Sequence, residues 1–143
     1  MTREPIYAAL YAKLSAAAGF VTTSRKLKHW SDTPPADQPA LFLSQRHETT
    51  VPMPPGMPYR YVFHVDVYLY AYTGASPDVA PATILNPLHD AVHAALAPNA
   101  VTGKQNLGGL VEHCWIEGDT ATDEGTLGSQ GVFIIPISIL VVA

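Results

Sequence analysis

The sequence has a single cysteine, Cys114, among its 143 residues. A lone thiol excludes an internal disulfide and a cysteine-rich zinc site. Charge is also scarce, because 14% of the residues are charged, and eight basic against twelve acidic residues give a formal charge of −4. Proteins that bind nucleic acid by neutralising its phosphates are usually basic, so this composition argues against non-specific DNA binding.

Long apolar runs are missing as well. The longest late one, residues 132–143, is shorter than the roughly 20 residues that a membrane-spanning helix needs. The first residues lack the cationic and then apolar order of a signal peptide. We therefore expect one soluble domain, residues 1–143, with no membrane contact. Since 48% of the residues are hydrophobic, this domain can build a core and still expose apolar surface to a partner.

Two segments have the spacing of amphipathic helices. Residues 2–18 place apolar side chains on one face, with Thr2 as the predicted N-cap. A second helix is predicted to begin at a cap on Ser76 and to end at Pro98. Pro87 lies inside this second segment and predicts a kink or a restart there.

Alternating apolar and polar residues predict the strands, of which residues 59–72 are the clearest. Gly108 and Gly109 predict a hairpin turn, Pro136 predicts a bulge or an edge, and residues 118–131 read as an exposed, flexible acidic loop. The other predicted strands are residues 20–21, 24–30, 40–46, 102–107, 110–117 and 132–142. This order predicts an α+β fold in which two helices pack on a largely antiparallel β-sheet.

Motifs of catalysis are scarce. The sequence has no GxSxG for a nucleophilic serine and no GxGxxG for a phosphate. His89 and His93 share a helical face and resemble part of the HExxH zinc pattern, but Asp90 replaces the glutamate and no third ligand follows. We expect a solvent-facing pair, no metal, no cofactor and no enzymatic activity. A small metal-dependent hydrolase that uses His89 and His93 remains the alternative.

Opposite charges are concentrated in different parts of the chain. The basic group is Arg25, Lys26 and Lys28, and the acidic group is Glu112, Glu117, Asp119, Asp123 and Glu124. A small domain with one patch of each sign is suited to head-to-tail contact between identical copies, which closes into a ring if the rotation permits. The alternative is two solvated surface patches.

Residues 51–58 form a loop that is rich in proline and holds Met53 and Met57, the two methionines inside the chain. Proline excludes helix and inner strand here, so the loop is predicted to project. Exposed methionine makes an adaptable apolar contact surface, and Tyr59 adds an aromatic ring of the kind that interfaces favour. An ordinary hairpin tip is the alternative. We prefer an assembly subunit to an enzyme.

The chain resembles the tail terminator, or tail-completion, proteins of long-tailed bacteriophages. The resemblance rests on the order of segments: an amphipathic first helix, then SRKLKHW, QPALFL, YVFHVDVYLYAY, ILNPLHDAVHAAL and NLGGLVEHCWIEG before an apolar last strand. It implies an α+β subunit of a six-membered ring at the head-proximal end of the tail tube. The length and proline content of residues 51–58 depart from the family and leave the partner of that loop open.

Such a ring ends polymerisation of the tube, contacts the tail tube protein and offers a docking face to the head–tail connector or neck protein. The resemblance implies no catalytic residue, and it implies DNA that only passes through the channel. The location that it implies is the tail of the virion, after assembly in the cytoplasm of the host bacterium. A neck, head-closure or adaptor ring subunit is the alternative within the same assembly.

Overall fold

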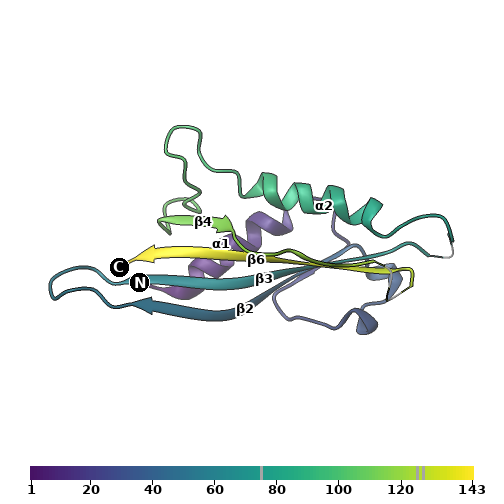
Figure 1. Ribbon diagram of the computed structural model, residues 1–143, viewed down its shortest axis with the longest axis horizontal. Helices are drawn as coiled ribbons and strands as arrows, with labels where there is room; N and C mark the ends of the chain where they lie inside the picture. Colours follow the sequence, from purple (N-terminus) through teal and green to yellow (C-terminus); the bar gives the residue numbers. More distant parts are fainter. Residues whose placement is uncertain (75, 125, 127) are drawn as a thin grey trace.

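The computed structural model describes residues 1–74, 76–124, 126 and 128–143. In it two helices lie on one side of a six-stranded sheet, so the predicted α+β fold is confirmed (Figure 1). The helices are α1 (Arg3–Ser15) and α2 (Ala82–Ala95). The strands are β1 (Thr22–Ser24), β2 (Ala40–Val51), β3 (Arg60–Tyr72), β4 (His113–Ile116), β5 (Ala121–Asp123) and β6 (Gln130–Val142). Two short 3-10 helices are η1 (Trp30–Asp32) and η2 (Pro35–Asp37).

The sheet has the order β1-β2-β3-β6-β4, and β5 also pairs with β6. The β1–β2 pair is parallel, whereas the other pairs are antiparallel. All thirteen residues of β3 pair with β6, so these two strands form the centre of the sheet. The hairpin between β2 and β3 projects at the end of the molecule where both chain termini lie (Figure 1).

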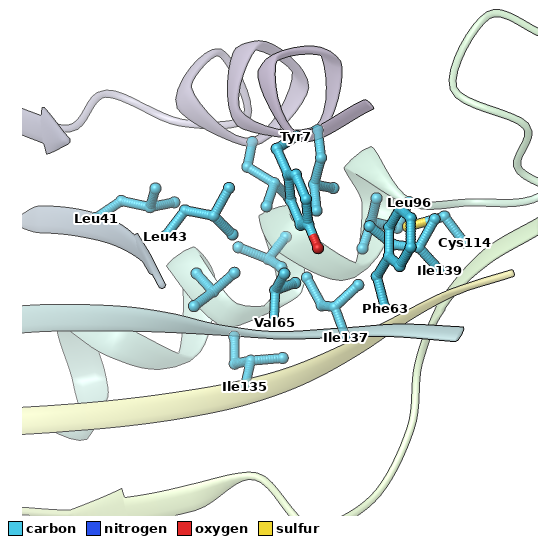
Figure 2. Packing of buried hydrophobic residues seen from close by; sticks show 14 of the residues in the cluster. Tyr7, Leu41, Leu43, Phe63, Val65, Leu96, Cys114, Ile135, Ile137 and Ile139 are labelled. Atoms are coloured by element: carbon cyan, nitrogen blue, oxygen red, sulfur yellow. The ribbon is translucent and has the colours of Figure 1, made fainter. Parts of the chain in front are cut away.

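Alternation along the strands divides the sheet into two faces. Side chains such as Phe63 and Val65 of β3 and Ile137 of β6 point to the helices, where they are buried (Figure 2). Tyr7 of α1 stacks on Phe63 with 5.4 Å between the ring centroids. Cys114 of β4 is buried in the same core. This layer of fully buried apolar side chains accounts for most of the hydrophobic stabilisation, at roughly 25 cal/mol for each Å² removed from water.

The helices begin and end within the predicted segments. Thr2 is the N-cap residue of α1, as predicted, but its side chain makes no capping hydrogen bond. Helix α2 begins at Ala82 rather than near Ser76, and there the Glu124 carboxylate accepts a hydrogen bond from the Ala82 backbone N–H at 3.1 Å. The predicted restart at Pro87 is wrong, since α2 continues through it. Pro87 is exposed, so water can hydrate the carbonyl that lost its partner.

Three predicted strand assignments are wrong. Residues 20–21 precede β1 and are not a strand, residues 24–30 leave the sheet after Ser24, and residues 102–107 form turns instead of one arm of a hairpin. The short β4 instead pairs with β6, far along the chain. Within residues 118–131, the predicted loop contains β5 and the first residues of β6; positions 125 and 127 lie outside the described residues. Long-range pairing with β6 overrode the local glycine signal in both places.

Pro136 lies in the inner strand β6 at a place where it costs no hydrogen bond. On that side of β6, β4 ends opposite Ile137 and β5 begins opposite Ile134. Pro136 therefore faces the gap between the two short strands, where its carbonyl accepts the Glu117 N–H at 3.2 Å. The sequence-based expectation of a local edge at this proline is confirmed.

A segment between β1 and β2 covers part of the second face of the sheet. Trp30 packs there against a small cluster of Ala40, Phe42, Tyr70 and Val132. The buried amides of Gln38 and Gln130 donate to each other's oxygen at 2.8 and 2.9 Å. Because both amides are satisfied, they fix the path of this segment without leaving a buried polar group unpaired.

Gly131 of β6 lies in close contact with the start of α2. A Cβ atom there would lie 2.5 Å from Pro81 Cβ and 2.7 Å from Leu85 Cδ1. Replacement of Gly131 by Ala should therefore force α2 away from β6 and lower the free energy of unfolding by about 1–3 kcal/mol. Urea denaturation followed by circular dichroism measures this loss.

The matched control is Gly19→Ala, where a Cβ would meet no atom within 4 Å. This control should leave the stability unchanged or raise it by up to about 1 kcal/mol. Equal stabilities of the two variants would contradict the close approach of α2 to the sheet.

Candidate interaction surfaces

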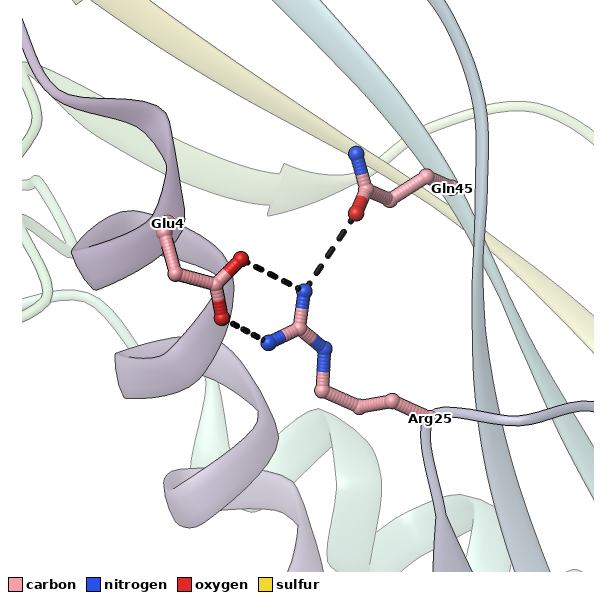
Figure 3. A network of polar contacts seen from close by, with 3 residues as sticks. All are labelled: Glu4, Arg25 and Gln45. Atoms are coloured by element: carbon pink, nitrogen blue, oxygen red, sulfur yellow. Dashed lines mark hydrogen bonds and ion pairs between the residues drawn. The ribbon is translucent and has the colours of Figure 1, made fainter.

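The predicted basic group does not form one free patch. Arg25 forms an ion pair with Glu4 of α1, and its Nη2 donates to Gln45 Oε1 of β2 at 3.3 Å (Figure 3). The Arg3 guanidinium makes a second link from α1 to the sheet, with bonds of 2.7 and 2.8 Å to the Glu48 carboxylate. Arg25 therefore joins a helix to the sheet within one chain, and its charge is not available to a partner.

Lys26 and Lys28 remain available. Both are exposed, and neither forms an ion pair within the described residues. Lys26 follows β1 at the outer edge of the sheet. The chain then turns over the second face, where the Tyr70 hydroxyl donates to the Lys28 carbonyl at 2.7 Å. Between the two lysines lies Leu27, a large apolar side chain that is 39% exposed.

Some of the predicted acidic residues also have partners within the chain, whereas others form no ion pair with the described residues. Glu124 caps α2 and Glu117 accepts a hydrogen bond from Ser138 Oγ at 3.0 Å, so both have structural partners. Asp119 and Asp123 form no ion pair with any described residue. They lie between β4 and β5 and at the end of β5. Glu112 pairs with Lys104 on a surface loop.

The register places the free charges on opposite edges of one sheet. A single row of paired residues runs Thr22, Ala40, Tyr70, Val132 and Asp123, from β1 to β5. Lys26 follows the first of these strands, and Asp119 and Asp123 flank the last. The two edges are four strand spacings apart, about 19 Å. A basic and an acidic edge therefore lie at the same level along the strands and face away from each other.

An open apolar pocket of about 410 Å³ adjoins the acidic edge. Its lining residues are Trp30, Ala121, Thr122, Asp123, Val132 and Ile134. The pocket exists because the covering segment brings Trp30 from near β1 to the opposite side of the sheet. Sequence reasoning did not identify this pocket, since no local pattern indicates that Trp30 and β5 are neighbours.

One end of the molecule is apolar. Val51 ends β2, Tyr59 precedes β3 and Val142 ends β6, and the register pairs these strand ends side by side. Met57 at the hairpin tip is 52% exposed and Tyr59 is 50% exposed, whereas Met53 is half-buried. Met1, Leu110 and Val142 line or adjoin an open pocket of about 340 Å³ at the same end. We call Val51, Met57, Tyr59, Leu110, Val142 and Met1 the apolar end.

The uncovered half of the second sheet face is polar. His64 does not pair with Asp66, which forms an ion pair with Arg46 at 3.2 Å. His64 stacks instead on His47, with ring centroids 4.2 Å apart. Its Nδ1 lies 3.4 Å from Ser138 Oγ. The bulge between Gln45 and His47 brings these two imidazoles into register, which the sequence could not indicate.

The His89 and His93 side chains meet on α2. Their Nε2 atoms are 3.1 Å apart, and the His89 ring lies edge-on to Phe133 with a centroid distance of 5.7 Å. Burial and the neighbouring His93 lower the pKa of His89. No group of three or more His, Cys, Asp or Glu suited to a metal occurs in the part of the chain that is described.

Burial raises the pKa of Cys114 to about 12, so this thiol is protonated near neutral pH.

Comparison with known proteins adds no family. No family model matches the sequence, and no curated protein matches it. Neither helix, across the residues described, combines the length and the apolar composition that crossing a membrane requires.

The ion pairs that fasten α1 predict a dependence of stability on pH. The pKa values of Glu4 and Glu48 are lowered from their ordinary value of 4.5, chiefly by hydrogen bonds from Arg25 and Arg3. Their contribution is therefore complete above pH 4.5 and is lost as the pH falls through the lowered values. The double variant Glu4→Gln/Glu48→Gln should lose less stability on acidification than the wild type. Urea midpoints measured between pH 6 and pH 3 test this, and identical pH profiles would contradict it.

Proposed function

We propose that this chain is the subunit of a head-to-tail ring at the head-proximal end of a long bacteriophage tail, where it ends polymerisation of the tube. The observation that carries this proposal is the position of free charge on opposite edges of one sheet. Lys26 at one edge and Asp119 and Asp123 at the other make each copy complementary to the next. Such a contact is heterologous, and it closes into a ring when the rotation between copies is a whole fraction of a turn.

Charge alone does not hold such an interface together. An exposed ion pair contributes at most about 1 kcal/mol, so apolar burial has to supply most of the affinity. The pocket beside Asp123 offers that burial, because Trp30, Val132 and Ile134 line it. Leu27, exposed between two lysines, is an apolar side chain of suitable size on the complementary segment. The proposed contact between copies therefore combines an apolar centre with a charged rim.

The apolar end and the charged edges face in different directions. It lies at the ends of the strands, whereas the edges lie at right angles to the strands within the sheet. Copies joined through their edges would leave the apolar end of every subunit on one rim of the ring. We assign this rim to the tail tube protein, since exposed Met and Tyr favour a protein contact over water. The opposite rim would then face the head connector.

Charge exchange tests the ring. The variant Lys26→Glu/Lys28→Glu has two acidic edges and Asp119→Lys/Asp123→Lys has two basic ones, so each alone should shift to monomers. An equimolar mixture should form rings of alternating copies, because every acidic edge then meets a basic one. Native mass spectrometry counts the copies. Asp78→Lys, an exposed acid on the α2 side, is the control and should assemble normally. A wild type that stays monomeric at all concentrations would contradict the proposal.

Tail length tests the termination of the tube. Deletion of the gene in a producing strain should give overlong tails in electron micrographs, because nothing ends the growth of the tube. Complementation with Met57→Glu/Tyr59→Glu should restore rings but not tail length, since charge on the apolar end opposes docking. The control Val79→Glu, at the opposite end of β3, should restore normal tails. If the deletion strain instead gives tails of normal length that stay unattached to heads, the chain belongs to the neck.

A further inference from the structure

The His89 and His93 imidazoles meet on α2 and take no part in the proposed ring. The two residues are four apart on α2, so they lie one above the other on the same face of the helix. Their Nε2 atoms already converge to 3.1 Å. A hydrogen bond holds them there, in which one imidazole donates to the other.

The separation of the two nitrogens fits a shared cation. Metal–imidazole bonds are about 2.0–2.1 Å long, so two ligands at a right angle have nitrogens about 2.9 Å apart and tetrahedral ligands about 3.3 Å apart. The observed distance falls between these values. A cation could therefore bind between the two Nε2 atoms with little movement of either ring. For this the donating imidazole releases its Nε2 proton to water and takes one up on Nδ1, so that both rings bind the cation as neutral ligands.

The surroundings fix the His89 ring in place and leave the His93 ring exposed to solvent. The His89 ring is fixed edge-on against Phe133 of β6, whereas His93 is exposed. A bound ion would thus reach solvent on the His93 side, where water can complete its coordination. In the described residues no third His, Cys, Asp or Glu is grouped with the pair, so the site differs from a structural or catalytic zinc centre.

We propose that His89 and His93 form a two-imidazole chelate for one divalent copper, nickel or zinc ion on the surface of α2. Neutral imidazole suits these three ions, and among them affinity for copper is the greatest. The ion would tie two successive turns of α2 together. These turns follow Pro87, which removes a backbone hydrogen bond from the preceding part of the helix. The cation would therefore stabilise the helix that covers β6.

The test uses untagged full-length protein, because a polyhistidine tag would bind the same ions. Titration with copper(II) chloride, followed by calorimetry and by electron paramagnetic resonance, should show one ion for each chain with two nitrogen ligands. His93→Ala should weaken binding by about a hundredfold, since a chelate becomes a single contact. His93 is exposed, so this variant should keep the wild-type circular dichroism spectrum.

His47→Ala is the matched control, because His47 belongs to the other close pair of imidazoles, with His64. This control should bind copper as the wild type does. Loss of binding in His47→Ala, or equal binding by His93→Ala and the wild type, would overturn the proposal. None of these outcomes depends on ring formation, so the cation site and the tail function fail or succeed separately.

Discussion

The antiparallel ladder between β3 and β6 is the constraint on which the rest of this structure depends. It joins thirteen residues of each strand, so the register of every other strand is set from it. Alternation along the ladder directs Phe63 and Ile137 to the helices and directs Tyr70 and Ser138 to the opposite face. A slip of one residue would exchange the two faces and place the apolar set in water. The buried core therefore fixes where each surface lies.

Polar groups then determine how the second face is covered. The chain leaves β1 and crosses the sheet until Trp30 reaches β6, and the reciprocal Gln38–Gln130 amide bonds hold the end of this path. Burial raises the pKa of Tyr70 to about 12, so its hydroxyl stays protonated and donates to the Lys28 carbonyl. This crossing creates the apolar pocket beside β5. The same crossing explains why Arg25, Lys26 and Lys28, which are close together in the sequence, have different surroundings.

Much of the fold could be predicted from local patterns, and the errors have a common cause. Strand β3 and the stripe of α1 follow from periodicity, because the face of each that points into the core is largely buried. At the start of α2, the Ala82 N–H donates to Glu124, which is 42 residues away in the sequence. Similarly, β4 and β5 are strands because β6 offers them an edge. Such pairings are long-range, so no window of sequence around Gly108 or Asp119 contains them.

For the candidate surfaces, too, some features follow from the sequence and others only from the packed structure. By itself the sequence determined the scarcity of charge, the separation of basic and acidic residues along the chain, the projecting proline-rich hairpin and the histidine spacing on α2. The tertiary structure decided which of those residues are free: it used Arg25 and Glu124 for internal contacts and left Lys26 and Asp123 on opposite edges. The reason is physical. Residue types set what a side chain can bind, but the neighbours that compete for it come from distant segments that only the packed sheet brings together.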